Sequence, residues 1–408
     1  MSELTNKKLW NKDFVLLLQA NIVSTIGDLM YSVAIGYWVY EETGSSGLMG
    51  IMSAISMFVS MFLSPFTGSI TDRCNRKWIL VCMDLLQSAI MITIGILAYM
   101  DKLTTPGILI AAFLAALGTT FYSPAASTLM LDIIPHDDMV RGQSVFSGAN
   151  SFINMVGTAF SGVMVAFFGV PLIVIINGLS NLYSAISELF INVPKTVKQG
   201  EPVTVKGLFN DYSSAAKQVF SDKYMSIFFP CLIIINLLGA GPLTLVLPFV
   251  MEKGFTVDMY GYIMSIFTAA SLVSVLILSI VKLTPKLRLW IMTIGFCGTS
   301  VFLALAYLST NFIWMCIFTF IGAFMNTAGN TIFNASFMLA IPEENRGTIM
   351  GLIQSASVGG TAISAVMYGL LGDVFPLYIV FTVGTVISLI PMMYMCLNKK
   401  TKEFILSH

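Results

Sequence analysis

The segment Gly68-Ser69-Ile70-Thr71-Asp72-Arg73-Cys74-Asn75-Arg76-Lys77 lies between two long apolar runs and decides how the rest of the chain is interpreted. A membrane-crossing helix cannot carry so many charged side chains in its middle, so the segment is predicted to be a tight polar turn between two membrane spans. Gly68 allows two helices to approach closely, and Asp72 can accept hydrogen bonds from the N-terminus of another helix. The three basic residues favour a cytoplasmic position, which an ordinary positive-inside anchor explains equally well.

Composition places the chain among multi-pass membrane proteins, because 56% of its 408 residues are hydrophobic and only 10% are charged. The 21 basic and 21 acidic residues leave no net charge, so no nucleic-acid partner is expected. The cysteines are scattered without a CxxC pair and are interpreted as apolar packing residues. The sequence contains no Walker A, HExxH or Ser-His-Asp motif, so we predict neither an enzyme nor a cofactor or metal site.

Twelve apolar runs exceed the roughly 18 residues that a helix needs to cross a membrane core. They lie at about 14–40, 46–70, 78–100, 105–131, 143–168, 171–193, 224–250, 259–281, 289–308, 312–340, 348–372 and 375–397. With both termini inside, 19 of the 21 basic residues fall in cytoplasmic segments and only Lys102 and Lys253 fall outside. This asymmetry favours an all-α integral protein of the cell membrane, with cytoplasmic N- and C-termini.

The longest polar segment divides the twelve spans six and six. We predict an N-terminal six-helix bundle at 1–193, a cytoplasmic linker at 194–223 and a C-terminal six-helix bundle at 224–408. Residues 206–220 of the linker carry a helical apolar stripe, which suits either a helix on the inner membrane face or a plain tether. Similar short motifs occur where the fourth span of each half ends, as expected for two parallel repeats.

The spacing G-x3-D-R-x-x-R-K resembles the signature loop of the major facilitator superfamily, which joins helices 2 and 3. The matching positions are Gly68, Asp72, Arg73, Arg76 and Lys77. Asn75 stands where the superfamily usually has glycine, and asparagine tolerates the left-handed backbone conformation. The resemblance implies that this loop is a conformational latch that acts through contacts across the two halves. Asp132 closes the fourth span and is expected to pair with Arg73 or Arg76.

Asp28 lies near the middle of the first span, where a charge is costly and therefore a functional candidate. It shares one helical face with Asn21, Thr25 and Ser32. No Lys or Arg lies deep in any predicted span, so Asp28 has no evident salt-bridge partner. Burial without a partner favours the neutral acid, which can gain and lose a proton near neutral pH. A protonated acid that holds helices together is the structural alternative.

Glu188, in the sixth span, is a weaker candidate for a transport role. It continues a polar face through Asn177, Asn181 and Ser184, but it lies near the inner boundary, where water can hydrate it. In the superfamily, helices 3 and 6 also pack outside the central cavity. Asp84, near the inner surface of the third span, is predicted to pair with the basic loop and to be structural.

Asparagines recur every four residues along the tenth span, at Asn326, Asn330 and Asn334. Their amides are expected to face other helices or water, because lipid cannot satisfy them. In the superfamily, helices 1, 4, 7 and 10 line the substrate cavity, so the resemblance makes Asp28 and these asparagines cavity candidates. Interhelical hydrogen bonding is the alternative, and it is the preferred interpretation of a polar stripe at 147–161 in the fifth span.

The order of features resembles the bacterial macrolide-efflux branch of the superfamily: a charged leader, an acid in the first span, the polar segment 37–45 and the signature loop. This resemblance implies secondary active export of amphipathic neutral or cationic drugs by proton antiport with alternating access. The expected partners are a small lipophilic substrate, protons and the lipid bilayer, and the protein is expected to act as a monomer. The arginine of helix 4 and the proline of helix 5 that are frequent in proton-coupled drug antiporters are absent.

Two other classes of function stay open. An exporter or importer of a specific metabolite, such as a siderophore, would transport one compound saturably and give no protection against drugs. A non-transporting membrane sensor or assembly partner would show no flux and no effect of Asp28→Asn.

Overall fold

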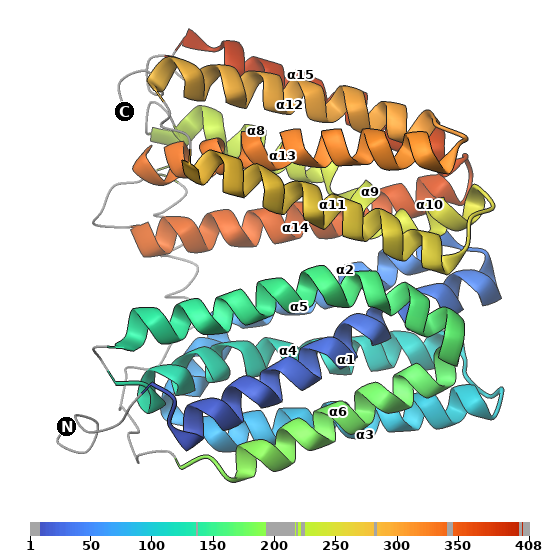
Figure 1. Cartoon of the computed structure of the whole chain (residues 1–408), viewed down its shortest axis with the longest axis vertical. Helices are drawn as coiled ribbons and strands as arrows, with labels where there is room; N and C mark the ends of the chain where they lie inside the picture. The colour runs from blue at the N-terminus through green and yellow to red at the C-terminus, as the bar shows by residue number, and fades with distance from the viewer. Residues whose placement is uncertain are drawn as a thin grey trace. The chain divides into compact units, whose positions relative to one another are not determined.

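The computed structural model describes residues 9–135, 138–192, 217, 219–221, 225–280, 284–340, 346–399 and 402. The regular elements of these residues are long α-helices (Figure 1). In the N-terminal half they are α1 Lys12–Thr43, α2 Ser46–Arg73, α3 Arg76–Tyr99, α4 Thr105–Ile133, α5 Met139–Phe168 and α6 Val170–Leu189. In the C-terminal half they are α8 Met225–Gly239, α9 Gly241–Thr244, α10 Val246–Glu252, α11 Val257–Ile280, α12 Pro285–Leu308, α13 Phe312–Ala340, α14 Arg346–Gly372 and α15 Leu377–Leu397.

Eleven stretches of the described residues are long and apolar enough to cross a membrane. They correspond to eleven of the twelve predicted spans. The remaining predicted span, at 143–168, is covered by α5, a helix of 30 residues that is not among the eleven. The described residues therefore form an all-helical, multi-pass membrane protein, and the count of twelve spans stays a prediction.

The contacts divide the chain into two compact units, Met1–Gly44 with Ile55–Val203 and Ser45–Ala54 with Thr204–His408. The first turns of α2 belong to the second unit because they pack on α14. There the Gly47 N–H donates to the Asp373 carboxylate at 3.0 Å. Most of the predicted linker at 194–223 lies outside the described residues, and so does most of its expected apolar stripe.

The turn between the second and third spans is shorter than the quoted segment. Because α2 continues to Arg73 and α3 begins at Arg76, the turn consists of two residues, Cys74 and Asn75. Asn75 has a φ of −69°, and its side chain accepts a hydrogen bond from the Lys77 N–H at 3.1 Å. Asn75 therefore does not adopt the left-handed conformation that asparagine tolerates. Its short polar side chain serves instead as the N-cap of α3.

In the first unit, α6 packs against both α1 and α3 (Figure 1). Two glycines make the approach of α3 and α6 possible. A methyl group on Gly95 would lie 3.0 Å from the Ile175 nitrogen, and one on Gly178 would lie 3.0 Å from the Ile92 nitrogen. The polar side chains along α6 are consequently enclosed between two neighbouring helices.

The seventh predicted span, a continuous run at 224–250, is broken in the structure into α8, α9 and α10. Pro242 explains the break, because proline has no N–H group and cannot continue the hydrogen-bond ladder of a helix. Glycines at Gly239 and Gly241 flank the break and add backbone freedom. Hydropathy alone misses such a break, since apolar residues continue on both sides of it.

Two side chains of α14 satisfy the backbone groups that the break exposes. The Gly241 N–H donates to Ser364 Oγ at 2.8 Å, and the hydroxyl of the fully buried Tyr368 donates to the Leu238 carbonyl. In a membrane, backbone groups without partners cost several kcal/mol each. The two contacts therefore stabilise a discontinuous helix that would otherwise be unfavourable.

Candidate functional site

Two carboxyl groups are buried together in the first unit, Asp84 on α3 and Glu188 on α6. These residues are only 2% and 0% exposed, respectively. Ser184 lies beside Asp84, and Glu188 follows one helical turn later on α6. The two acids are close enough to interact electrostatically. Together with Tyr122 of α4 they form a group that we call the acid cluster.

Among the described residues, the two carboxyl groups of the acid cluster have few hydrogen-bond partners. The Tyr122 hydroxyl donates to Glu188 Oε1 at 2.9 Å. Among the described residues, Glu188 Oε2 and Asp84 Oδ2 are buried without a hydrogen-bond partner. An unpaired carboxylate costs several kcal/mol to remove from water, and two carboxylates at one site repel each other. The arrangement is therefore suited to holding at least one proton.

Asp28 lies on α1 and is partly exposed, unlike the acid cluster. It faces α6, where Asn177 and Asn181 are 0% and 1% exposed and Asn181 Nδ2 donates to Asn177 Oδ1 at 3.1 Å. Gly27 permits this approach, because an added methyl group would collide with the Asn177 side chain. Asp28 also interacts electrostatically with Asp84. Polar groups of α6 thus connect a partly exposed acid with a buried pair.

The structure says less about the roles of the other residues on the predicted polar face of α1. Asn21 and Thr25 are both partly buried. Ser24 Oγ donates to the Asn21 carbonyl at 3.2 Å, and among the described residues Asn21 Oδ1 is buried without a partner. Asn21 therefore offers an acceptor on the side of α1 that carries Asp28.

The structure changes the interpretation of the two weaker acids. Glu188 is fully buried, so the expected hydration near the inner boundary is absent. Asp84 has acids as its electrostatic neighbours, and the described basic side chains of the 68–77 loop bind elsewhere. Tyr122 is missed by sequence reasoning, because a single tyrosine in an apolar span is usually a packing residue.

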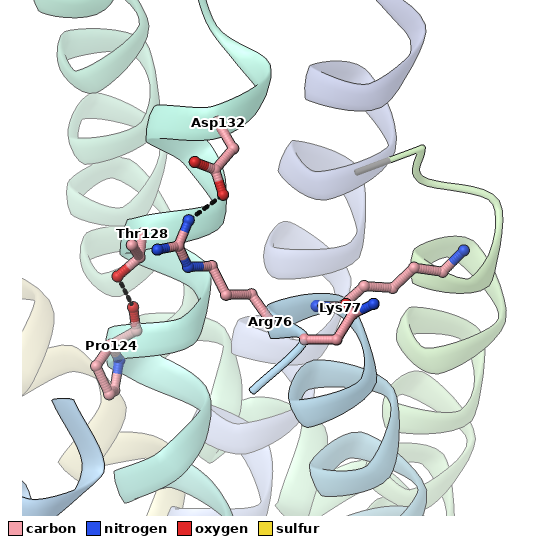
Figure 2. Close-up of polar contacts among 6 residues, drawn as sticks. Arg76, Lys77, Pro124, Thr128 and Asp132 are labelled. Atoms are coloured by element: carbon pink, nitrogen blue, oxygen red, sulfur yellow. Dashed lines mark hydrogen bonds and ion pairs between the residues drawn. The ribbon is translucent and has the colours of Figure 1, made fainter. Parts of the chain in front are cut away.

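The predicted latch is partly visible at the start of α3 and the end of α4 (Figure 2). The guanidinium group of Arg76 forms an ion pair with the Asp132 carboxylate, and these side chains are 10% and 19% exposed. Lys77 points the other way and donates to the Leu189 carbonyl at the end of α6, at 2.6 Å. The two basic residues thus connect the start of α3 with the ends of two neighbouring helices.

Three predicted latch residues lie at the end of α2. Gly68, Asp72 and Arg73 belong to its last two turns. Their side chains lie outside the described parts of the structure, and the expected contacts across the two halves stay a prediction.

We expect the Arg76–Asp132 pair to contribute measurably to stability, because both groups are largely removed from water. Arg76→Ala should lower the free energy of unfolding by about 1–3 kcal/mol, the cost of leaving a hydrogen-bonded charge unpaired. A double-mutant cycle with Asp132→Ala, followed by thermal unfolding of the purified protein, measures the coupling directly. Lys77→Ala is the matched control, since it removes a neighbouring positive charge without breaking this pair. Equal losses for Arg76→Ala in the presence and absence of Asp132 would contradict the coupling.

The asparagines of the tenth predicted span lie in the second unit, on α13. Asn330 Nδ2 donates to the Asn326 carbonyl at 2.9 Å and to Asn326 Oδ1 at 3.1 Å. Both residues line a cavity of about 190 Å³ within that unit. Asn334 follows on the same helix, and its side chain lies outside the described parts.

Members of the polar stripe in the fifth predicted span make hydrogen bonds within α5, and the interhelical interpretation stays a prediction. Asn150 Nδ2 donates to the Phe146 carbonyl at 3.1 Å, and Ser161 Oγ donates to the Gly157 carbonyl at 2.6 Å. Such bonds to the preceding turn satisfy a polar side chain locally. A four-residue repeat alone does not distinguish the two arrangements.

Comparison with known proteins identifies the class to which these features belong. The fold is similar to that of a bacterial homologue of the human lysosomal transporter Spinster, which matches 97% of the chain at a TM-score of 0.76. That match covers 97% of the solved chain at 13% identity. A bacterial homologue of the iron transporter ferroportin matches with a TM-score of 0.71 at 12% identity, covering 94% of this chain and 98% of that one. At these identities the likeness shows the fold alone.

The family model described as the Major Facilitator Superfamily matches residues 17–281 and 231–403. The chain therefore belongs to this superfamily, and this membership points to a transporter rather than an enzyme. This assignment agrees with the resemblance carried by the 68–77 loop.

The chain spans about half or less of the length of the curated relatives that it matches. Macrolide efflux protein A of Streptococcus pyogenes is 23% identical over 186 residues, which is 46% of each chain. The multidrug efflux pump Tap of Mycobacterium tuberculosis is 28% identical over 160 residues, which is 38% of each chain. A putative bacilysin exporter of Bacillus amyloliquefaciens is 24% identical over 190 residues, covering 46% of this chain and 44% of that protein.

Proposed function

We propose that the chain is a secondary active transporter that exports neutral or cationic amphipathic compounds from the cell in exchange for protons. The observation that carries this proposal is the acid cluster, two buried carboxyl groups on α3 and α6 with an electrostatic link to Asp28. An acid inside a membrane-spanning unit is expensive and is a default candidate for a proton relay. The named efflux functions of the partial relatives support export as the direction.

In the proposed cycle, Asp28 exchanges a proton for cargo because it is the partly exposed acid. Its deprotonated form attracts a cationic compound or accepts a hydrogen bond from a neutral one. Protonation from the outside then releases the cargo, and release of this proton to the cytoplasm restores the form that binds cargo. In this proposal the buried pair of Asp84 and Glu188 is the second site that can bind the proton. There the Tyr122 hydroxyl orients the Glu188 carboxyl group.

The Arg76–Asp132 pair is proposed to hold the inner ends of α3 and α4 together during this cycle. The proposal places the protein in the cell membrane as a monomer, with both termini in the cytoplasm. Alternating access then exposes Asp28 to one side at a time, as in other secondary transporters of repeated architecture.

Uptake of radiolabelled erythromycin into inside-out membrane vesicles tests the proposed function. An imposed proton gradient, acid inside the vesicle, should drive accumulation by wild-type protein, and a protonophore should abolish it. Asp28→Asn should reduce gradient-driven uptake by on the order of 100-fold, as expected when a positioned proton-transfer group is lost. Asp258→Asn, at the start of α11, is the matched control because it makes the same chemical change outside the site.

Each outcome of this experiment separates the alternatives. Uptake that survives Asp28→Asn would move the coupling to the acid cluster alone. Absence of uptake by wild-type protein, with the protein folded and inserted, would contradict macrolide export. In that case a screen of single metabolites would replace the drug.

A further inference from the structure

Residues of the 239–245 break between α8 and α10 line two cavities of the second unit. One has a volume of about 140 Å³ and a mainly apolar lining that includes Leu243, Val246, Phe249, Phe267 and Met315. The other has a volume of about 190 Å³ and a more polar lining that includes Asn236, Thr299, Ser300, Asn330 and Thr385. Gly239, Leu303, Tyr307 and Asn326 line both. The two cavities therefore form adjoining apolar and polar chambers beside a discontinuous helix.

Specific side-chain contacts stabilise the break, so it is not a frayed helix end. Ser364 and Tyr368 of α14 bind its exposed backbone groups, and both side chains are buried. A discontinuous helix inside a membrane is tolerated where it is enclosed by protein or lines a cavity, and it often marks a binding site. Here the cavities adjoin the break, and the helix around it provides lining residues to each chamber.

The linings specify the chemistry of a ligand. Among the described residues, neither chamber is lined by a charged side chain. Asn330 Nδ2 donates to the Asn326 carbonyl and to Asn326 Oδ1, and neither bond uses Asn326 Nδ2 or Asn330 Oδ1. An amide can donate two hydrogen bonds and accept two, so these two atoms can bind a ligand. The polar chamber can therefore bind hydroxyl, carbonyl or amide groups, and the apolar chamber suits an aromatic or branched aliphatic group.

The volumes limit the size of that ligand. An engineered cavity of about 150 Å³ holds benzene, whereas drug-sized ligands occupy roughly 300–1,000 Å³. Each chamber consequently accommodates a ring-sized group and not a macrolide.

We propose that the 239–245 break is a second binding site, which takes a small uncharged amphipathic molecule with its apolar part beside Phe249 and its hydroxyl or amide group on Asn326. This site lies in the second unit, whereas the acid cluster and Asp28 belong to the first. It does not depend on the transport activity proposed above.

Photolabelling of the purified full-length protein in lipid nanodiscs tests the second site. The probe is a phenyl diazirine that carries a hydroxymethyl group, and peptide mass spectrometry locates the adducts. Labelling should be saturable, should be displaced by excess benzyl alcohol, and should fall on peptides that contain Leu243, Leu303 or Asn326. No transport is measured, so failure here leaves the proposed export function untouched.

Two variants make the experiment specific. Leu303→Trp should fill both chambers and reduce labelling of these peptides at least about tenfold, equivalent to 1.4 kcal/mol of binding. Leu305→Trp is the matched control, because Leu305 lies on the same helix and is 40% exposed. Asn326→Leu, which keeps the volume similar, should weaken displacement by benzyl alcohol but not by toluene.

Two results would overturn the proposal. One is labelling that rises linearly with probe concentration and spreads over the exposed faces of the helices, as simple partitioning into lipid produces. The other is equal labelling of wild type and a correctly folded Leu303→Trp. If Leu303→Trp does not fold, an unchanged benzyl alcohol displacement in Asn326→Leu decides against the site.

Discussion

Glu188→Gln is expected to reduce proton-driven uptake by on the order of 100-fold while leaving the purified protein at least as stable to heat as wild type. Glutamine has nearly the same shape and keeps an oxygen that can accept the Tyr122 hydroxyl hydrogen bond. It cannot release or bind a proton. Because a buried carboxyl group without a cation is costly, its neutral replacement should not destabilise the fold. Vesicle uptake and a thermal unfolding curve on the same preparation measure both parts.

Tyr122→Phe separates the hydrogen bond from the acid. It keeps both carboxyl groups and removes the hydroxyl that donates to Glu188 Oε1. We expect uptake to persist with a displaced pH optimum, because the proton on Glu188 is then held differently.

Normal gradient-driven uptake by Glu188→Gln would show that the acid cluster is structural. A large loss of thermal stability would show that the carboxyl group is needed in its charged form.

Gly384→Ala is expected to be the most destabilising small substitution in the second unit. A methyl group on Gly384 would occupy the position of the Tyr368 hydroxyl and would lie 3.0 Å from Tyr368 Cε1. The ring is fully buried, so it cannot move aside without losing its bond to the Leu238 carbonyl. Overpacking of about 1–3 kcal/mol adds to a lost hydrogen bond of similar size.

The loss is measured as a lower unfolding temperature and as reduced yield of folded protein. Gly360→Ala on α14 is the matched control, because the nearest atoms to an added methyl group there are at 3.5 Å, an ordinary contact. Wild-type stability of Gly384→Ala would contradict the role of Tyr368 in holding the break open.

The spans were predictable because about twenty consecutive apolar residues have few alternatives to a membrane helix. The position of the 74–75 turn follows in the same way from the charges around it. The break at Pro242 was harder to predict because hydropathy is insensitive to a missing N–H group. The sequence Gly239-Ala240-Gly241-Pro242 nevertheless carries the signal.

The acids show where sequence reasoning reaches its limit. Asp28 is recognisable as a candidate because it lies in mid-span on a polar helical face. The pairing of Asp84 with Glu188 depends on the register between α3 and α6, which Gly95 and Gly178 set by close packing. A single sequence does not contain that register. The Asn326–Asn330 contact is local and follows from helical spacing, but the cavity beside it depends on helices far apart in the chain.

Proton release on drug binding tests the coupling most directly. Purified protein in a weakly buffered solution with a pH-sensitive dye is mixed with erythromycin near neutral pH. Wild-type protein should acidify the solution as the drug binds, and both Asp28→Asn and Glu188→Gln should release markedly less acid, with Asp258→Asn as the unaffected control. Drug binding by wild-type protein without any change in dye signal would contradict proton exchange at this site.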